Sequence, residues 1–175
     1  MGRVGIDDLE ALQSLRLDLS AQDELLDAQT ECTFVFQGEH GWPSGVVMSF
    51  LRADGAFWLT AVRSRPHAKA LARDPRVTLV VSNAGTGSTG RQMLAVRGVA
   101  TVHDDAPTTA WFLERFTARM QPGDPVAFAR LLDSPGRVVV EVRPVAVAVS
   151  HDSRKMPGNG RGAPAPSAVD AGVGG

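Results

Sequence analysis

The sequence predicts a mainly β fold, an antiparallel barrel of six to seven strands with short helices at its rim. Two observations lead to this class. Runs of β-branched and aromatic residues recur along the chain, separated by turn residues. Several neighbouring runs are joined by hairpin-type connections, the clearest being Asp54-Gly55, a pair that readily adopts the positive φ angles of a tight turn. A parallel α/β sheet is not expected.

The first part of the chain predicts one helix and two hairpins. Ser20–Gln29 has helical character, with Ser20 as the expected N-cap. The expected strands are Cys32–Gln37, Val46–Leu51 and Ala56–Leu59. The turns between them are Gly38–Pro43 and Ala53–Gly55.

The middle of the chain predicts a short helix and another hairpin. The helix covers Pro66–Arg73 and ends at Asp74-Pro75, because a residue before proline avoids the helical region. The strands Val77–Ser82 and Met93–Val102 flank a glycine-rich loop, and Gly98 is placed where a bulge or bend is expected.

The last part of the chain predicts two helices followed by two strands. The helices are Pro107–Met120 and Asp124–Leu132. The strands Arg137–Val142 and Val145–Val149 are separated by Pro144, which suits a sheet edge or a bulge.

The domain organisation follows from composition. Length (175 residues) and hydrophobic content (43%) suit one domain with one substantial core, which we assign to residues 20–156. Residues 1–19 form an N-terminal extension. Residues 157–175 are dominated by Gly, Ala, Pro and Ser, which do not repay the entropy of ordering, so a disordered tail is expected there.

Charge and cysteine content exclude several classes of function. The net charge is -1, from 18 basic and 19 acidic residues, so no nucleic-acid or anionic-membrane partner is expected. There is no apolar run of membrane-spanning length, and the single cysteine, Cys32, suits a reducing compartment; we expect a cytoplasmic protein. The four histidines lack metal-ligand spacing, so no metal site is expected.

The segment Thr60–Lys69 has the composition of an anion-binding turn. It follows an expected strand, enters an expected helix, and carries two hydroxyls and the cations Arg63, Arg65 and Lys69. A phosphate needs positive charge and hydrogen-bond donors together, and this turn supplies both. His67 is a secondary candidate. A merely solvated basic turn is the alternative interpretation.

A second, weaker candidate is Arg91-Gln92 at the start of a strand. An amide side chain both donates and accepts hydrogen bonds, as the edge of a flat heterocycle requires. The preceding loop, Gly85–Gly90, lacks the spacing of a nucleotide-binding fingerprint.

Taken in chain order, these segments resemble the pyridoxamine 5'-phosphate oxidase-like family of split-barrel flavin-binding proteins. The resemblance covers roughly residues 25–150. It rests on the segments Val46–Phe50, Asp54-Gly55, Phe57–Thr60, Ser64-Arg65, Asp74–Val77, Arg91-Gln92 and Val96–Ala100. It implies a six- to seven-stranded antiparallel split barrel of the FMN-binding type.

The resemblance also implies where a cofactor binds. In the family, one strand lays its backbone beside the flavin ring, a basic turn approaches the phosphate, and a glutamine lies near the ring. Together with the basic turn, the expected cofactor-binding residues are Val46, Val47, Met48, Ser49, Thr60, Arg63, Ser64, Arg65, Lys69 and Gln92. Vitamin-forming members have Ser-Arg-Lys where this chain has Ser64-Arg65-Pro66, so the role of the lysine is assigned to Lys69.

The implied function is that of an FMN-binding oxidoreductase with the cofactor at a homodimer interface. A deazaflavin coenzyme is the alternative cofactor. The family's C-terminal Arg-x-His signature is not found in His151–Met156, so vitamin-forming activity is not expected and the substrate stays open. The alternative function is non-catalytic binding or sequestration of a flavin, deazaflavin or haem, and a homologue that binds no cofactor is a third possibility.

Overall fold

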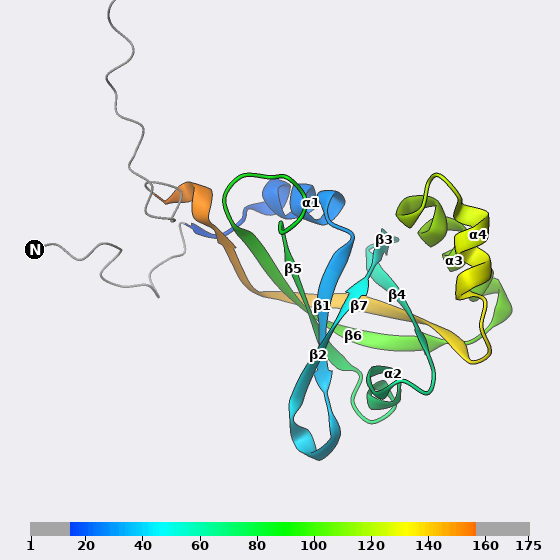
Figure 1. Ribbon diagram of the computed structural model, residues 1–175. Helices are drawn as coiled ribbons and strands as arrows, with labels where there is room; N and C mark the ends of the chain where they lie inside the picture. Colours follow the sequence, from blue (N-terminus) through cyan, green and yellow to red (C-terminus); the bar gives the residue numbers. More distant parts are fainter. Residues whose placement is uncertain (1–14, 157–175) are drawn as a thin grey trace, which may run out of the picture.

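Seven antiparallel strands form one curled sheet, a half-barrel, in the computed structural model, which describes residues 15–156 (Figure 1). The strands are β1 (Glu31–Gln37), β2 (Pro43–Ser49), β3 (Leu51–Ala53), β4 (Ala56–Val62), β5 (Arg76–Ser82), β6 (Gln92–His103) and β7 (Arg137–Asp152). Their order across the sheet is β2-β1-β5-β6-β7-β4-β3. The predicted mainly β split barrel is confirmed. The predicted tail, 157–175, lies outside the described residues.

Short helices lie at the rim of the sheet. They are α1 (Leu19–Ala28), α2 (Pro66–Leu71), α3 (Ala106–Met120) and α4 (Pro125–Leu132), together with the single-turn 3₁₀ helices η2 (Glu39–Gly41) and η3 (Ser153–Lys155). In Figure 1, α1 lies at one end of the sheet, α2 at another, and α3 and α4 lie side by side. The four predicted helices are present, with ends shifted by a few residues, and the predicted strands are found except at two places, around Phe50 and Pro144.

The two edges of the sheet are joined by a single residue, Phe50. β2 forms one edge and pairs with β1, whereas β3 forms the other edge and pairs with β4. The phenyl ring of Phe50 is 1% exposed, and its backbone N–H donates to the carbonyl of Thr30 at 2.9 Å. Because consecutive strands belong to opposite edges, the sheet has to curl on itself. The single strand predicted over Val46–Leu51 is therefore two strands, broken at Phe50.

The hairpin between β3 and β4 confirms the prediction made from Asp54-Gly55. Both residues have positive φ angles, 53° and 73°. Aspartate and glycine tolerate this conformation better than most residues, which explains their use at this turn.

The longest pairing joins β6 and β7, and it contains two bulges. The register shifts between Ala95 and Val96 and between Arg97 and Gly98. Gly98, predicted at a bend, lies opposite Pro144. The expectation of two strands split by Pro144 is wrong, because Arg137–Asp152 is one strand. The proline is tolerated since it lies at a bulge, beyond Val142 where pairing with β4 ends.

The first helix begins one residue earlier than predicted, and its cap is different. Asp18, not Ser20, is the N-cap, and its carboxylate accepts from the backbone N–H of Ala21 at 2.9 Å. The Ser20 hydroxyl donates instead to Glu24 at 3.2 Å. Leu17 is buried in the core and its N–H donates to the Ser150 hydroxyl, so the packed domain begins before residue 20.

Three groups of apolar side chains hold the elements together. The largest fills the inside of the curled sheet beneath α1 and includes Phe34, Leu59 and Leu79. A second group packs α3 and α4 against the outer side of β3, β4 and β7, through Phe112 and Phe116. A third, small group lies under α2. The outer helices therefore attach to one end of the long strands and leave the rest of the outer face open.

Replacement of Gly98 by alanine is expected to destabilise the fold. A Cβ atom there would lie 2.5 Å from Val142 Cγ1 and 2.8 Å from the Arg143 carbonyl oxygen. Such overpacking costs about 1–3 kcal/mol. We expect Gly98→Ala to lower the free energy of unfolding, measured by urea denaturation, by that amount. Gly123→Ala is the control, because a Cβ at Gly123 meets nothing within 4 Å. Equal stabilities of the two variants would contradict the close approach of β6 and β7.

Candidate functional site

The candidate site is the seam between β2 and β4, where the curled sheet stays open. Beyond Trp58, β4 has β7 as its neighbour on one side and no strand on the other, among the described residues. β2 likewise pairs with β1 alone. Met48 of β2 packs across the seam against a small cluster formed by Ala61, Ala68 and Val138. The structure therefore brings β2 beside the start of α2.

The four residues of β2 predicted to bind a cofactor alternate in direction. Val46 and Met48 are partly buried and pack on the barrel core, whereas Val47 is 70% exposed. Ser49, the last residue of the strand, is half-buried. The side of β2 that faces away from β1 keeps its backbone donors and acceptors free of strand partners within residues 15–156. A flat heterocycle can hydrogen-bond to such an edge.

The turn from Thr60 to Lys69 is held in place by backbone hydrogen bonds. The N–H of Arg63 donates to the Gly136 carbonyl at 2.8 Å, and that of Arg65 to the Val62 carbonyl at 2.9 Å. The Thr60 hydroxyl donates to the Val138 carbonyl at 2.9 Å, so its proton is engaged and its oxygen can still accept a hydrogen bond. Pro66 starts α2, where a missing N–H costs nothing.

The turn carries an excess of positive charge at its surface. Arg63, Arg65 and Lys69 are all exposed, and Ser64 is exposed between them. Arg63 is paired with Asp104 at 2.5 Å. Within the described part of the chain, Arg65 and Lys69 take part in none of the ion pairs. Two exposed cations without carboxylate partners thus lie on one turn and attract an anion.

His67 adds less to this charge than its cationic neighbours do. Its ring is half-buried and packs on Phe36, with the ring centroids 6.1 Å apart. Burial, and then the charge of Arg65, lower the pKa of His67. The lowered pKa favours the neutral imidazole, so His67 contributes less positive charge to the turn than the arginines and Lys69 do.

Gln92 lies away from the turn, at the other end of the long strands. It pairs with Asp152 of β7, whereas Thr60 pairs with Val139. Thirteen residues of strand separate these two β7 positions, roughly 40 Å of strand length at 3.3 Å per residue. Within one protomer, Gln92 and the turn therefore lie at different ends of the long strands, because β6 and β7 carry Gln92 to the α1 end, and its contact with a cofactor ring stays a prediction.

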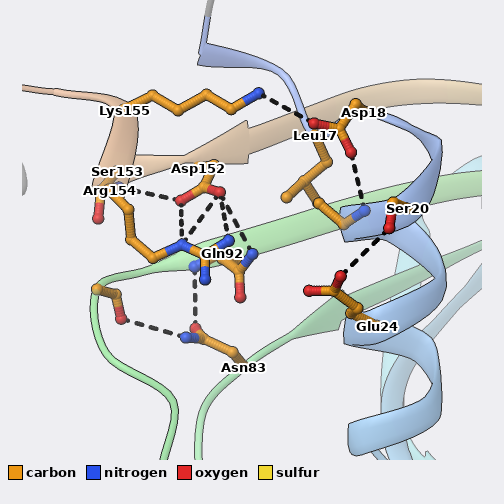
Figure 2. Close-up of polar contacts among 12 residues, drawn as sticks. Leu17, Asp18, Ser20, Glu24, Asn83, Gln92, Asp152, Ser153, Arg154 and Lys155 are labelled. Atoms are coloured by element: carbon orange, nitrogen blue, oxygen red, sulfur yellow. Dashed lines mark hydrogen bonds and ion pairs between the residues drawn. The ribbon is translucent and has the colours of Figure 1, made fainter.

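The side chain of Gln92 belongs to a buried polar network that Figure 2 shows. Its backbone N–H donates to Asn83 Oδ1 at 2.9 Å, and its amide donates to Asp152 Oδ2 at 3.4 Å. Asp152 is 2% exposed and accepts from Arg154 through Nε at 2.9 Å and through a terminal nitrogen at 2.7 Å. The hydrogen bonds from Arg154 lower the pKa of Asp152, against the opposing effect of burial.

This network fastens three segments to one another. The hydroxyl of Ser153 accepts from the N–H of Arg91, and Lys155 Nζ donates to the Arg16 carbonyl at 2.6 Å. The end of β7, the glycine-rich loop and the start of α1 are thus held together (Figure 2). We call Asn83, Gln92, Asp152, Ser153 and Arg154 the end latch. The sequence signal for it is slight, an Asp-x-Arg spacing that also occurs at Asp74 and Arg76.

A second polar group, not identified from sequence, lies on the outer face beside α3. Glu141 is 6% exposed, and its carboxylate lies 3.0 Å from His103 Nε2 and 2.6 Å from an Arg143 nitrogen. His103 packs on Trp58, which itself donates to the Ala53 carbonyl. Trp58 is buried and packs with Phe112 and Phe116. The partners of Glu141 offset the cost of burying its charge.

Other kinds of site find no support in the part of the chain that the structure describes. Residues 15–156 hold no group of three or more metal-ligating side chains. Burial raises the pKa of Cys32 to about 12, so its thiol is unreactive. None of the helices described is both long and apolar enough to cross a membrane.

The fold and the seam place the chain among the split-barrel proteins. Comparison with known proteins identifies the family within this class. The family model described as "Pyridoxamine 5'-phosphate oxidase" matches residues 20–151. The chain therefore belongs to the pyridoxamine 5'-phosphate oxidase-like family. This confirms the resemblance inferred from the order of its segments. A search of curated proteins finds no match.

Solved structures share the fold at low sequence identity. A conserved protein from Mycobacterium tuberculosis is 20% identical, with a TM-score of 0.68, over 93% of this chain and 96% of the other. The haem storage protein HutZ from Vibrio cholerae is 14% identical, with a TM-score of 0.62, over 75% and 94%. A protein named F420 reductase is 22% identical, with a TM-score of 0.55, over 72% and 94%. These similarities establish the architecture.

The end latch gives a test of stability. Asp152→Asn removes the charge that Arg154 binds while keeping the size of the side chain, and hydrogen bonds to charged groups contribute about 1.5–3 kcal/mol. We expect a loss of about 2 kcal/mol in the free energy of unfolding at pH 7, measured by urea denaturation. Asp74→Asn is the matched control, because Arg76 binds Asp74 in the same way but the Arg76 side chain is 78% exposed and the Asp74 side chain 18%. It should change stability less.

The same variant has a pH signature. Because the pKa of Asp152 is lowered from its usual 3.8, its stabilising effect is present above pH 3.8 and is lost as pH falls further. The stability difference between wild type and Asp152→Asn should therefore shrink in unfolding measurements carried below pH 3.8. A constant difference down to pH 2 would show that the carboxylate charge is not responsible.

Proposed function

We propose that this chain is an FMN-binding oxidoreductase that holds its cofactor along the seam. The observation that carries the proposal is the placement of two features across one gap. The free edge of β2 lies on one side, and the basic turn from Thr60 to Lys69 lies on the other, linked by the packing of Met48. A ligand with a phosphate at one end and a hydrogen-bonding ring at the other suits this pair.

The residues present fit such a cofactor. Arg65 and Lys69 supply charge to the phosphate, and Ser64 supplies a hydroxyl donor. Arg63 also contacts the phosphate when its ion pair with Asp104 breaks or when its guanidinium binds both groups. The backbone of Val46–Ser49 lies along the ring. The Thr60 hydroxyl donates to the Val138 carbonyl in this structure, so its oxygen is left to accept from a donor group of the cofactor.

The proposed chemistry is that of the cofactor, which accepts and donates hydride or electrons when bound. The role of this chain is to bind the ring and orient it. Within residues 15–156 we assign no acid or base to the reaction. Gln92 is buried in the end latch and is left out of the proposed single-protomer site. A deazaflavin coenzyme, which also carries a phosphate, is the alternative cofactor, and the fold similarity to a protein named F420 reductase is in keeping with it.

We also propose that the chain forms a homodimer with the cofactor at the interface. Beyond Val142, every residue of β7 up to Val149 is exposed, and pairing with β4 has ended. Val145, Val147 and Val149 are 70%, 46% and 47% exposed. A run of exposed valines on an open strand marks a protein interface.

We further propose that the protein is located in the cytoplasm, a reducing compartment in which Cys32 stays a free thiol.

Absorbance of the purified protein tests the function directly. A flavin spectrum, or quenching of FMN fluorescence on titration, supports the proposal, and a protein that binds neither FMN nor a deazaflavin refutes it. Reduction of the bound cofactor by a nicotinamide donor separates an oxidoreductase from a carrier. Turnover requires that the bound cofactor be reduced, by a nicotinamide donor or by the substrate itself, whereas a protein that only sequesters its ligand need not reduce it.

Removal of two cations from the turn should weaken FMN binding. We expect the double variant Arg65→Ala with Lys69→Ala to raise the dissociation constant by about tenfold or more, since charge-assisted hydrogen bonds to phosphate are lost. Fluorescence titration measures it. Arg73→Ala is the control, because Arg73 is an exposed arginine just outside the turn. Riboflavin, which lacks the phosphate, should bind the double variant and the wild type alike. Unchanged FMN affinity would rule out the turn as the phosphate site.

A charge placed on the exposed valine run should dissociate the dimer. We expect light scattering to give twice the 18.5 kDa of the chain for the wild type and a single chain mass for Val147→Asp. Leu131→Asp on α4, where the side chain is 73% exposed, is the control and should stay dimeric. A monomeric wild type would be evidence against the shared site.

A further inference from the structure

A groove runs between α3 and α4, separate from the seam. Its volume is about 810 Å³, within the range of ligand sites. One wall comes from α3 through Ala106, Ala110 and Leu113, and the other from α4 through Val126 and Ala129. No side chain of α4 is fully buried, and Val126 is 60% exposed. The packing of the two helices therefore leaves the apolar walls of this groove uncovered by the described chain.

Two arginines that line the groove, Arg130 and Arg137, have no carboxylate partner among the described residues, and of these Arg130 is exposed to solvent. Among the lysines and arginines of residues 15–156, Arg137 alone is not exposed. No ion pair in that part of the chain includes it, although five other arginines are paired. Its guanidinium donates to the Leu132 carbonyl at 2.7 Å and to the Ser134 hydroxyl at 2.9 Å. A guanidinium has five N–H donors, so donors remain.

Burial without a counterion has an electrostatic cost. Desolvation lowers the pKa of Arg137, and nothing in its surroundings raises it again. An arginine stays charged even so, and a half-buried charge is best stabilised by an anion. The carboxylates Asp104, Glu114 and Asp133 also line the groove, but none forms an ion pair with Arg137. A bound anion would supply the counterion that residues 15–156 do not provide for Arg137.

The groove adjoins the turn that is proposed to hold the cofactor phosphate. Gly136, which precedes Arg137, accepts from the N–H of Arg63, and Asp104 at the rim pairs with the side chain of Arg63. Residues 62 and 137 are also partners in the pairing of β4 with β7. The groove and the turn are therefore mechanically connected through Arg63, but their binding groups are different.

We propose that the groove between α3 and α4 binds a small, largely apolar molecule that carries one anionic group, with Arg137 as the partner of the anion. The small side chains of the two helices give the apolar part its space, and the half-buried guanidinium selects for negative charge. This site goes beyond the proposed cofactor function and does not depend on it, because none of the groups that bind the ligand belongs to the seam.

The test uses two dyes of one skeleton. 8-Anilinonaphthalene-1-sulfonate carries an anionic sulfonate, and N-phenyl-1-naphthylamine lacks it; both fluoresce on entering apolar sites. We expect the wild type to bind both and to prefer the sulfonate. Arg137→Gln should weaken binding of the sulfonate by about tenfold or more, the loss expected for a charge-assisted hydrogen bond, and change binding of the neutral dye less than twofold.

A second variant locates the site. Ala110→Trp fills the groove from an exposed helix position and should weaken both dyes, while the FMN titration of the seam stays unchanged. Ser134→Ala controls for the support that Ser134 gives to Arg137 and should leave the preference for the anionic dye in place. Circular dichroism checks that each variant is folded.

Several results would overturn the proposal. These are a wild type that does not bind the sulfonate, an Arg137→Gln variant that loses both dyes equally while folded, or undiminished binding of the sulfonate by Ala110→Trp. Should Arg137→Gln fail to fold, Ala110→Trp decides. A protein that binds the dyes but no flavin would refute the proposed function and leave this site standing.

Discussion

The architecture depends on one constraint, that the segment from Pro43 to Ala53 supplies both edges of the sheet. The chain leaves β2 at Ser49 and enters β3 at Leu51, so one residue spans the change of edge. Phe50 turns its ring into the core at this point. A flat sheet is impossible with this connectivity, and curling encloses the apolar interior. The curl also leaves a seam, because β3 pairs with only the first part of β4, from Ala56 to Trp58.

Because β6 and β7 are long, the candidate cofactor site and the end latch lie at different ends of the molecule. One end carries α3, α4 and the basic turn, and the other carries the end latch. Bulges near Gly98 and Pro144 bend the pair where it leaves the barrel. Polar groups that are alike in sequence therefore serve different purposes. The glutamine that resembles a cofactor ligand helps to fix the latch, whereas Arg65 and Lys69 of the turn lie at the surface outside the ion pairs of the described chain.

Local signals predicted most of the fold, because hairpins and short helices are specified by neighbouring residues. The Asp54-Gly55 turn and Gly98 illustrate this. Features that depend on distant partners were not visible. The N-cap of α1 is Asp18, two residues before the predicted Ser20. Pro144 lies within the single strand β7, because the pairing of β7 with β4 ends before it, at Val142. The basic turn is recognisable from composition, whereas the isolation of Arg137 follows from the absence of an ion pair to it within residues 15–156, which a sequence does not display.

The contact between Lys155 and Arg16, next to the end latch, has a consequence for the connectivity of the chain. Lys155 donates to the carbonyl of Arg16, so the two ends of the described domain meet at one corner beside α1 (Figure 1). Ends this close permit circular permutation. A short linker between residues 156 and 15, with new ends opened at the exposed tip around His40, would keep every strand pairing of the sheet. The order of strands in space, rather than their order along the chain, would then be the quantity that defines this fold.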